Sequence, residues 1–488
     1  MFTPLLDALI LFTLTTPLAG LIGRRIKHEK MAVATWVTVA FAFSLMLVFL
    51  LYSEVLWGAG LLIEHVSALP PEGVSLEADA LSMFLATIYL IIGSMASLFS
   101  IREIEEGSPT GFYAVLLGMI TAMVGVVFSG DLFTLFIFWE AMCLCSYTLV
   151  AFRKEKWESI EASFKYLIMS SAGSITILFA LSFLYGTTGT LNISYLSMSL
   201  KGSGESLMVY VALLMLLVGF GLKAGMVPFH TWLPDAHMAA PSSISAVLSG
   251  VMVKAGIYGL LKTLLVIFLP LQGSWRITLA AFAVLTMFVG NLSALPQDDI
   301  KRLLAYSTIA NSGYILLGIA VGSYRALTGS LFHVLNHALI KALLFLCAGA
   351  FIHGAGTRSL KDLAGIRRTM PVTGAAFIIG ALSLASIPPL NVFWSELTII
   401  TAGVEADMPS LSFLMILNLV FSAAYCLRMI QAIAVKRETS TSKKAKEAPL
   451  QMLVPILFLV VLSIIVGVYP APFQTLAETA AQAILSST

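Results

Sequence analysis

The sequence has little charge for its length. Only 11% of its 488 residues are Asp, Glu, Lys or Arg, and 59% are hydrophobic, whereas a soluble domain carries about 25% charged residues. Such a chain cannot cover itself with polar side chains, so most of it must face lipid or other membrane helices. A soluble globular enzyme is therefore excluded, and the predicted fold class is an all-α integral membrane protein.

The sequence also lacks an imbalance of charge and the motifs of a cofactor site. Its 28 Lys and Arg residues nearly match its 26 Asp and Glu residues, which gives no basis for nucleic acid or an acidic soluble partner. Cys143, Cys145, Cys347 and Cys426 lie inside apolar runs without a Cys-x-x-Cys pair, so we interpret them as small buried residues. No flavin, quinone, haem or iron–sulfur motif is present, and we expect no cofactor, no metal and no redox chemistry of the chain's own.

Long apolar runs, by contrast, recur from end to end. A helix needs about 20 apolar residues to cross a bilayer, and about fourteen segments of that size are present. The predicted spans are 2–22, 31–52, 79–101, 111–128, 131–151, 160–185, 207–227, 242–268, 277–295, 303–321, 327–352, 371–402, 411–434 and 450–470. The first has no basic region before it and no small-residue cleavage site after it, so we expect a retained span and not a signal peptide.

Lys and Arg are distributed unevenly between alternate loops. Nineteen fall in the loops on one side of the predicted bundle, and four, Lys201, Lys262, Arg276 and Arg325, fall in the loops on the other side. Because basic residues accumulate on the cytoplasmic side, the basic loops, including the turn with Lys301, are predicted to be cytoplasmic. Both termini then lie on the non-cytoplasmic side of a prokaryotic cell membrane.

Several ionisable residues lie inside apolar runs, where a charge costs about 2.5–3.5 kcal/mol on insertion scales and often marks an ion path. Glu140 lies nine residues after Asp131, and Lys254 lies twelve residues into its span, so a helical rise of about 1.5 Å per residue places both near mid-membrane. A buried Glu140 beside a buried Lys223 would exchange protonation states as another charge approaches or leaves. The alternative for this pair is a static ion pair that fixes two helices.

His333, His337 and Lys341 recur at four-residue spacing, which places them on one face of a helix. Histidine suits proton transfer because its unperturbed pKa is about 6.5. One histidine alone would equally fit a hydrogen bond to a carbonyl, but three titratable groups on one face indicate a transfer ladder. A metal site is not expected, since no carboxylate or cysteine shares this face.

Two spans, 207–227 and 371–402, look interrupted. Glycines and prolines surround Lys223 in the first, and Pro388 and Pro389 precede Glu396 in the second. Paired broken helices indicate inverted repeats and a transport site, and spans seven and twelve are five apart, so equivalent units would lie in opposite orientations. The predicted organisation is 1–110 for helices 1–3, 111–268 for the first five-helix repeat (helices 4–8), 277–434 for the second (helices 9–13), and 450–488 for helix 14.

Three further residues are accessory candidates for the pathway. Lys165 lies near the cytoplasmic end of its span, where its amine can reach the interface, so a structural role is as well supported as a functional one. His230 and His237 lie in or beside the first break. They are either exposed loop residues or a cytoplasmic entry to the region of Lys223.

Five stretches resemble one known family, the antiporter-like membrane subunits shared by respiratory complex I, Mrp-type Na+/H+ antiporters and group 4 membrane-bound hydrogenases, including formate hydrogenlyase. They are F-W-E-A-M around Glu140, G-L-K-A-G-M-V-P-F-H-T-W-L-P-D-A-H around Lys223, A-P-S-S-I-S-A-V-L-S-G-V-M-V-K-A-G-I-Y-G around Lys254, D-D-I-K-R-L-L-A-Y-S-T-I-A-N-S-G-Y, and N-H-A-L-I-K-A-L-L-F-L-C-A-G. Together they extend over residues 75–430.

The resemblance implies fourteen helices with two inverted five-helix units and discontinuous helices seven and twelve. It also implies that Glu140 and Lys223 are the coupled pair of the first half-channel, that Lys254 is the central relay, and that Glu396 is the terminal group beyond the His/His/Lys ladder. Some family members carry Lys at the position of Glu396. The chain ends shortly after span fourteen, without the long lateral helix of the largest complex I member, which favours an Mrp-type, hydrogenase-type or shorter complex I subunit.

The leading hypothesis is a proton-translocating subunit of a multisubunit membrane complex, with other membrane subunits, lipid and H+ as its partners. The main alternative is the exchange of Na+ for H+, because carboxylates and the carbonyls of a broken helix can coordinate Na+. A non-conducting scaffold paralogue is an alternative of another class, although such a chain has no need to keep costly buried charges.

Overall fold

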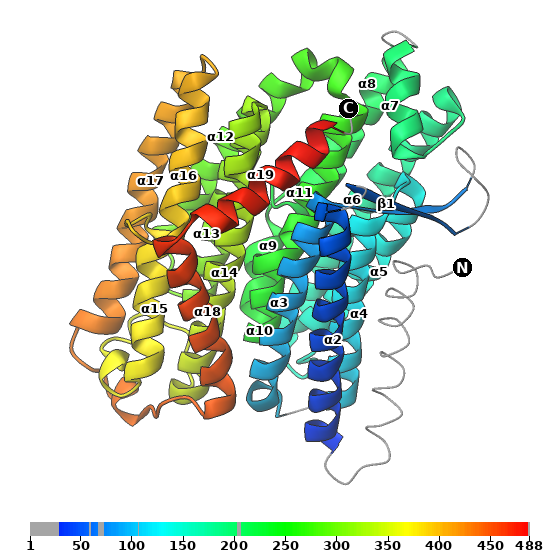
Figure 1. Ribbon diagram of the computed structural model, residues 1–488. Coiled ribbons are helices and arrows are strands. Elements are labelled where there is room, and N and C mark those ends of the chain that lie inside the picture. The colour runs from blue at the N-terminus through cyan, green and yellow to red at the C-terminus, as the bar shows by residue number, and fades with distance from the viewer. Residues whose placement is uncertain (1–28, 58–59, 67–72, 106, 203–205, 487–488) are drawn as a thin grey trace.

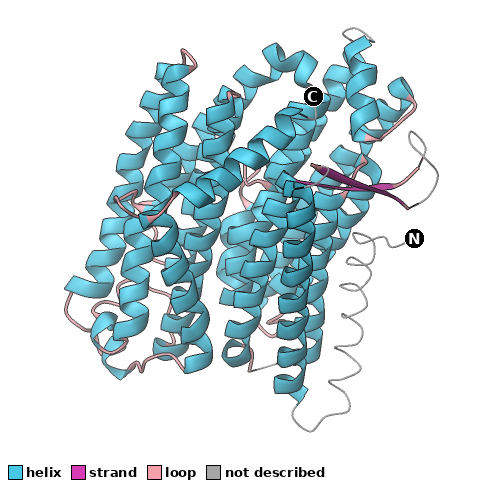
Figure 2. Ribbon diagram, viewed as in Figure 1, coloured by secondary structure: helices cyan, strands magenta, loops and turns pink. Residues whose placement is uncertain are grey.

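The protein is a bundle of long helices in the computed structural model, which describes residues 29–57, 60–66, 73–105, 107–202 and 206–486 (Figure 1). One short hairpin of strands lies at the edge of the bundle (Figure 2). Eleven helical segments of the described residues are long and apolar enough to cross a membrane, and two shorter apolar helices accompany them. The predicted all-α membrane fold is therefore confirmed.

The described helices of the first part of the chain coincide with predicted spans two to seven. They are α2 (Glu29–Trp57), α3 (Ala80–Glu103), α4 (Pro109–Phe128), α5 (Leu132–Val150), α6 (Trp157–Thr188) and α8 (Leu207–Lys223), which continues as α9 (Trp232–Ala239). The side chains of Asp79, Ser108 and Asp131 accept hydrogen bonds from backbone amides in the first turns of α3, α4 and α5, which satisfies donors without a helical partner. The predicted span 2–22 lies outside the described residues.

The eighth span lies at the centre of the bundle. It consists of α10 (Ser242–Val247), η1 (Leu248–Met252), α11 (Val253–Leu261) and η2 (Lys262–Ile267). All of its residues are buried, and it packs against α3, α8 and α14 (Tyr324–Ala355). Both η1 and η2 are π-helical turns, a rare geometry that is frequent at functional sites.

The long helices after the central span coincide with predicted spans nine to fourteen, and short helical turns lie between them. They are η3 (Leu269–Leu271), α12 (Gln272–Ala294), α13 (Ile300–Val321), α14, η4 (Ile366–Arg368), α15 (Pro371–Leu384), α16 (Asn391–Glu405), α17 (Pro409–Ile430), η5 (Gln431–Val435), η6 (Ser442–Lys444) and α18 (Leu450–Val468). In α13 and α14, 94% and 78% of the most apolar stretch is buried, so these two helices belong to the core and not to the surface that faces lipid.

Both predicted interruptions are confirmed, in span seven between α8 and α9 and in span twelve between α15 and α16. Gly225 has a φ of +74° in the first break, which a glycine adopts without strain. Irregular backbone at membrane depth needs partners for its polar groups. The Trp232 indole donates to the carbonyl of Leu222 at 3.1 Å, and the Ser422 hydroxyl donates to the carbonyl of Leu384 at 3.3 Å.

The two broken helices run in opposite directions through the bundle. In Figure 1, α8 lies above α9, whereas α15 lies below α16. The chain therefore crosses the first break downwards and the second break upwards, as an inverted repeat requires.

Several elements lie outside the predicted spans, and two strands and two helices are among them. Strands β1 (Leu61–His65) and β2 (Ser75–Asp79) form an antiparallel hairpin, and α7 (Ile193–Gly202) is a short helix between α6 and α8. Helix α19 (Ala471–Ser486) follows α18 and crosses the bundle obliquely against α3 and α14 (Figure 1). The segment 450–488 thus holds two helices where one was predicted.

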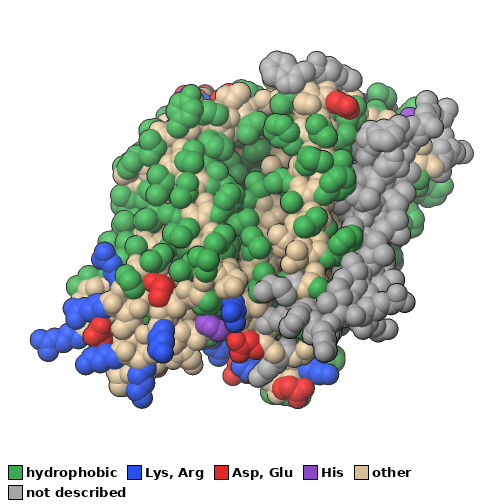
Figure 3. All heavy atoms as spheres, turned by 60° about the horizontal axis from the view of Figure 1, so that its bottom comes forward, with side chains coloured by type: hydrophobic (Ala, Val, Ile, Leu, Met, Phe, Trp, Pro, Cys, Tyr) green, Lys and Arg blue, Asp and Glu red, His purple; other side chains and the backbone are tan. Residues whose placement is uncertain are grey.

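Basic side chains gather at one end of the molecule. Figure 3 shows Lys and Arg concentrated on the end that lies at the bottom of Figure 1, below a surface that is mostly hydrophobic. Lys262 and Lys301 are exceptions to the sequence interpretation, because both were assigned to loops and both are buried. Buried ammonium groups need partners. Lys262 pairs with Asp79, and Lys301 donates to the carbonyl of Ala240.

Candidate functional site

The centre of the site is a contact between two basic groups. Lys254, on α11, and His337, on α14, are both buried, and Lys254 Nζ lies 2.6 Å from His337 Nδ1. The same amine donates to the carbonyl of Ser249, in the π-helical turn η1, at 2.6 Å. No Asp or Glu of the described residues pairs with Lys254. The contact joins the central span to α14, the helix that carries the predicted ladder of His333, His337 and Lys341.

The site continues from His337 towards the second break. The rings of His337 and His333 are stacked with centroids 5.9 Å apart. His333 Nδ1 lies 3.0 Å from Ser395 Oγ, and His333 Nε2 lies 3.0 Å from Asn311 Oδ1. Glu396, the next residue after Ser395, is buried and accepts a hydrogen bond from Ser386 in the break.

Lys341 shares the helix face of the two histidines but its amine contacts a different helix. It donates to the carbonyl of Leu304 at 3.1 Å and to the hydroxyl of Ser307, both on α13. Lys254, His333, His337 and the neighbour of Glu396 are therefore directly connected. Lys341 lies beside this row and is held by neutral oxygens.

Lys223 occupies a separate, aromatic site at the C-terminal end of α8. Its amine donates to Tyr166 Oη at 2.6 Å, to Cys143 Sγ at 3.0 Å and to Ser170 Oγ at 3.3 Å. It also lies 4.6 to 6.0 Å from the ring centroids of Trp139, Tyr147, Tyr166 and Trp232. Such rings attract a cation electrostatically, so we call these four residues the aromatic cage of Lys223.

Glu140 does not contact Lys223. No ion pair joins them within the described chain, so the expected side-by-side arrangement is wrong for this conformation. Glu140 is half-buried and follows Phe133 and Ile137 at helical spacing, and these two side chains are 48% and 53% exposed. Its carboxylate thus lies on the outward side of α5, while Oε1 is buried and has no hydrogen-bond partner among the residues that the structure describes.

The accessory candidates have three different environments. Lys165 is half-exposed and pairs with Glu161 at 2.8 Å and Asp235 at 3.3 Å. His230 is half-buried in the first break. His237 is fully buried against the ring of Phe345, with centroids 4.9 Å apart, and neither of its ring nitrogens has a hydrogen-bond partner within the described ranges.

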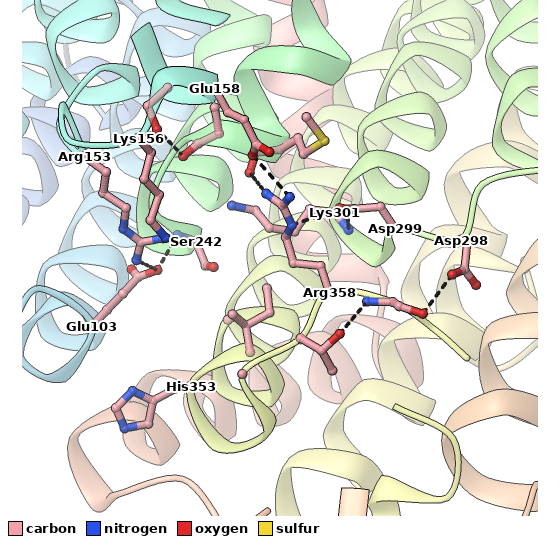
Figure 4. A pocket seen from close by; sticks show the side chains of 18 of the residues that line it. Glu103, Arg153, Lys156, Glu158, Ser242, Asp298, Asp299, Lys301, His353 and Arg358 are labelled. Carbon is pink, nitrogen blue, oxygen red and sulfur yellow. Dashed lines mark hydrogen bonds and ion pairs between the residues drawn. The ribbon is translucent and has the colours of Figure 1, made fainter. Parts of the chain in front are cut away.

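A cavity of about 890 Å³ opens at the basic end of the bundle, between the two predicted repeats. Figure 4 shows its charged lining, in which Arg153 faces Glu103, and Arg358 reaches Glu158 and Asp299. Lys301 lines the same cavity and donates to the carbonyl of Ala240 at 2.5 Å. Lys301, Lys341 and Lys254 also act electrostatically on His237, so this histidine lies between the cavity and the central row.

Sequence reasoning missed a neutral polar network in the second half. Asn291 Nδ2 donates to Tyr314 Oη at 2.9 Å and to Asn418 Oδ1 at 2.6 Å, and Tyr425 Oη donates to Asn291 Oδ1 at 3.1 Å. The ring of Tyr314 lies 6.0 Å from that of His333. These residues carry no formal charge, and the signal that could have found them is the presence of asparagines, Asn291 and Asn418, inside two apolar runs.

Comparison with known proteins gives this arrangement a context. The family model described as "NADH:quinone oxidoreductase/Mrp antiporter, TM" matches residues 129–422. The chain is 32% identical over 418 residues to NADH-quinone oxidoreductase subunit N of Desulforudis audaxviator, covering 82% of this chain and 83% of the relative. It is 30% identical over 419 residues to an Na(+)/H(+) antiporter subunit of Alkalihalophilus pseudofirmus, covering 86% of this chain and 85% of the relative.

The fold is also similar to a solved structure. A chain of the membrane-bound sulfane sulfur reductase (MBS), an archaeal respiratory membrane complex, superposes with a TM-score of 0.91 at 27% identity, over 99% of this chain and 97% of that one. These relatives are subunits of multisubunit membrane complexes. The resemblance noted in the sequence is confirmed, and an ion-translocating membrane subunit that works with other membrane subunits is the function consistent with all three.

Proposed function

We propose that this chain, which belongs to the NADH:quinone oxidoreductase/Mrp antiporter family of transmembrane subunits, moves protons along a row that runs from Lys223 through Lys254, His337 and His333 to Glu396. The observation that carries the proposal is the distance of 2.6 Å between Lys254 Nζ and His337 Nδ1. A hydrogen bond at this distance needs one donor and one acceptor, so the two basic groups cannot both be protonated. They share one proton, and a shared proton is a transferable one.

The direction beyond His337 follows from its contacts. His333 is stacked on His337 and bonded to Ser395, which precedes Glu396. A carboxylate that receives a hydrogen bond from Ser386 in a broken helix is suited to accept a proton and release it. Glu396 is therefore the proposed terminal group of the row.

The other end of the row reaches towards a partner subunit. Glu140 lies on a side of α5 with exposed apolar residues, where a charge facing lipid would be costly. We infer that a neighbouring membrane subunit covers this side, and that its charge acts on Glu140 and through it on Lys223. Lys223 and Glu140 are then coupled through the structure between them and not by direct contact.

We further propose that the basic end of the bundle is cytoplasmic, because Lys and Arg gather there. Both termini then lie on the opposite side. The cavity at the basic end, which Lys301 lines, is the proposed entry for protons, and His237 is the next group on the way to the central row. The two inverted repeats, 111–268 and 277–434, meet at the contact between Lys254 and His337.

The test is a charge-removing substitution at the centre. Lys254→Gln should abolish proton flux into vesicles that contain the complex purified with its native partner subunits, when the flux is driven by an imposed membrane potential. Lys361, an exposed lysine that does not line the cavity, supplies the matched control Lys361→Gln, which should leave the flux unchanged. An assembled Lys254→Gln complex with normal flux would refute the row and leave the scaffold function as the better account.

Exchange of Na+ for H+ is the second candidate, favoured by the 30% identity to an Na(+)/H(+) antiporter component. It would use the same carboxylates, Glu140 and Glu396, with Na+ as the counter-ion. Measuring proton flux with Na+ replaced by choline on both sides of the vesicle separates the two functions. Flux that continues in choline supports proton transport alone, and flux that stops supports exchange.

A further inference from the structure

The outer end of the central span carries a second group of buried charges. Lys262 begins the π-helical turn η2 at the end of the span that lies away from the basic cavity. Its side chain is 8% exposed, and Nζ lies 2.9 Å from Asp79 Oδ2. Asp79 ends strand β2 and caps α3 by accepting from the backbone amide of Ser82 at 2.7 Å.

Lys262 is connected in space to the central row by one face of a helix. Lys254, Tyr258 and Lys262 follow one another at four-residue spacing, which stacks them on the same side of the span. The ring of Tyr258 lies 5.9 Å from Lys262 Nζ, and its hydroxyl donates to the carbonyl of Val127 at 3.0 Å. The hydroxyl of Tyr89, buried close to Tyr258, has no hydrogen-bond partner among the described residues.

Two carboxylates, Asp79 and Glu77, act on this single lysine, and a third, Asp131, acts on Glu77. Glu77, on β2, interacts electrostatically with Lys262, Asp79 and Asp131. Asp131 is buried, and its Oδ2 has no hydrogen-bond partner in the part of the chain that the structure describes. Burial by itself raises the pKa of Asp79, but Lys262 and Ser82 offset that effect and the pKa lies below its ordinary value. Burial raises the pKa of Glu77, so Glu77 is the member of the group best able to take up a proton.

A structural ion pair does not need this composition. Asp79 alone is enough to neutralise Lys262, and Asp131 caps α5. The half-buried Glu77 is a second acid beside the same lysine, and its charged form is costly unless it exchanges protons, binds a cation or is fully hydrogen-bonded. The ladder from Lys254, the unpaired hydroxyl of Tyr89 and the excess of acid together describe a path that leaves the central row on the side away from the basic cavity.

We propose that Lys262, Asp79 and Glu77 form a second outlet for protons from Lys254, distinct from the outlet at Glu396. This inference rests on the proposed proton transport. The Lys262 ammonium gives its proton to the Glu77 carboxylate, which releases it to the non-cytoplasmic side. The neutral Lys262 amine then takes a proton from the Tyr258 hydroxyl, which is replenished at the same time by the Lys254 ammonium, so one proton leaves for each proton supplied.

The decisive variant is Lys262→Arg. Arginine keeps the positive charge and the ion pair with Asp79, but it does not deprotonate in proteins, so it cannot pass a proton on. The complex with its partner subunits should assemble with unchanged thermal stability and lose a measurable part of its potential-driven proton flux in vesicles. Lys361→Arg is the matched control and should have normal flux. Normal flux in assembled Lys262→Arg would overturn the outlet.

A second variant keeps the inference testable if Lys262→Arg does not assemble. Glu77→Gln leaves the Lys262 and Asp79 pair intact and removes only the group that releases the proton, and it should also lower the flux. Normal flux in Glu77→Gln would overturn the outlet. Lys254→Gln distinguishes failure of the outlet from failure of the proposed function. If Lys254→Gln abolishes the flux and both outlet variants have normal flux, the outlet alone is refuted. If Lys254→Gln has normal flux, the whole row is refuted.

Discussion

The two broken helices carry opposite charges near opposite helix ends. Lys223 is the last residue of α8, at the negative end of the helix dipole, whereas Glu396 lies in the second turn of α16, near the positive end. A helix terminus stabilises a charge of the opposite sign by about 0.3–1 kcal/mol, mainly within its terminal turn. Each break therefore favours the charge that it carries, and Lys223 gains more from its helix end than Glu396 does.

The surroundings of the two charges differ more than their helix ends. Lys223 is enclosed by the aromatic cage and by three hydrogen-bond acceptors, with no carboxylate in contact among the residues described. Glu396 has a single hydroxyl partner, Ser386, and follows the serine that contacts His333. The comparison indicates that the first half is built to hold a positive charge and the second half to pass a proton on.

The largest effect is expected from reversing the charge in the aromatic cage. Lys223→Glu places a carboxylate at the negative end of α8 and against the faces of aromatic rings, which loses cation–π contacts worth about 0.5–2 kcal/mol and adds repulsion. Proton flux should be abolished and the melting temperature of the purified complex should fall. Glu396→Lys should keep measurable flux, because the hydroxyl of Ser386 beside this position can accept a hydrogen bond from an ammonium as well as donate one to a carboxylate. Equal loss in both variants would contradict the asymmetry.

The sequence predicted the fold well because membrane insertion leaves a strong signal. Long apolar runs locate the helices, and Gly225 and the pair Pro388 and Pro389 locate the two breaks. The hairpin, α7 and α19 were missed because none is a run of about 20 apolar residues. The burial of Lys262 was missed because its partner, Asp79, is 183 residues away in the sequence.

The candidate site was only partly predictable. Spacing on one helix located His333, His337 and Lys341, since helical periodicity is a local property. Contacts between helices are not local. The pairing of Lys254 with His337, the separation of Glu140 from Lys223, and the aromatic cage depend on packing that no single segment specifies. The same holds for the network around Asn291, whose members carry no charge that would mark them.

A smaller effect is expected from removing one acceptor in the cage. Tyr166→Phe keeps the ring against Lys223 but deletes the hydroxyl 2.6 Å from the amine, and a hydrogen bond to a charged group contributes about 1.5–3 kcal/mol. Flux should fall by about tenfold or more, which corresponds to 1.36 kcal/mol per factor of ten. Tyr147→Phe, which keeps a ring 5.6 Å from the amine, is the matched control. Unchanged flux in both variants would show that the cage acts through its rings alone.

A change in the packing between α8 and α11 should reduce the proton flux less than a change in the aromatic cage. A methyl group on Gly256 of α11 would lie 2.6 Å from the amide nitrogen of Ala224 and 2.9 Å from the carbonyl of Phe220, at the end of α8. Gly256→Ala should destabilise the complex by about 1–3 kcal/mol and slow the flux, because Lys223 is displaced. In Gly186→Ala, the new methyl group meets no atom within 4 Å, so the stability of the complex and the proton flux should stay normal or improve. A stable Gly256→Ala complex with normal flux would show that the two regions work independently of this contact.

The smallest effect is expected at Lys165. This exposed lysine of the first half can be compared with the buried Lys223. Its side chain is 51% exposed and its partners Glu161 and Asp235 are partly solvated, so water and salt screen the pairs. Lys165→Gln should leave the melting temperature and the proton flux unchanged at physiological salt. Glu161→Gln, which removes one partner of the same pair, should behave in the same way. A loss of flux in Lys165→Gln but not in Glu161→Gln would mean that the amine itself serves transport, and Lys165 would then join Lys223 as a working lysine of the first half.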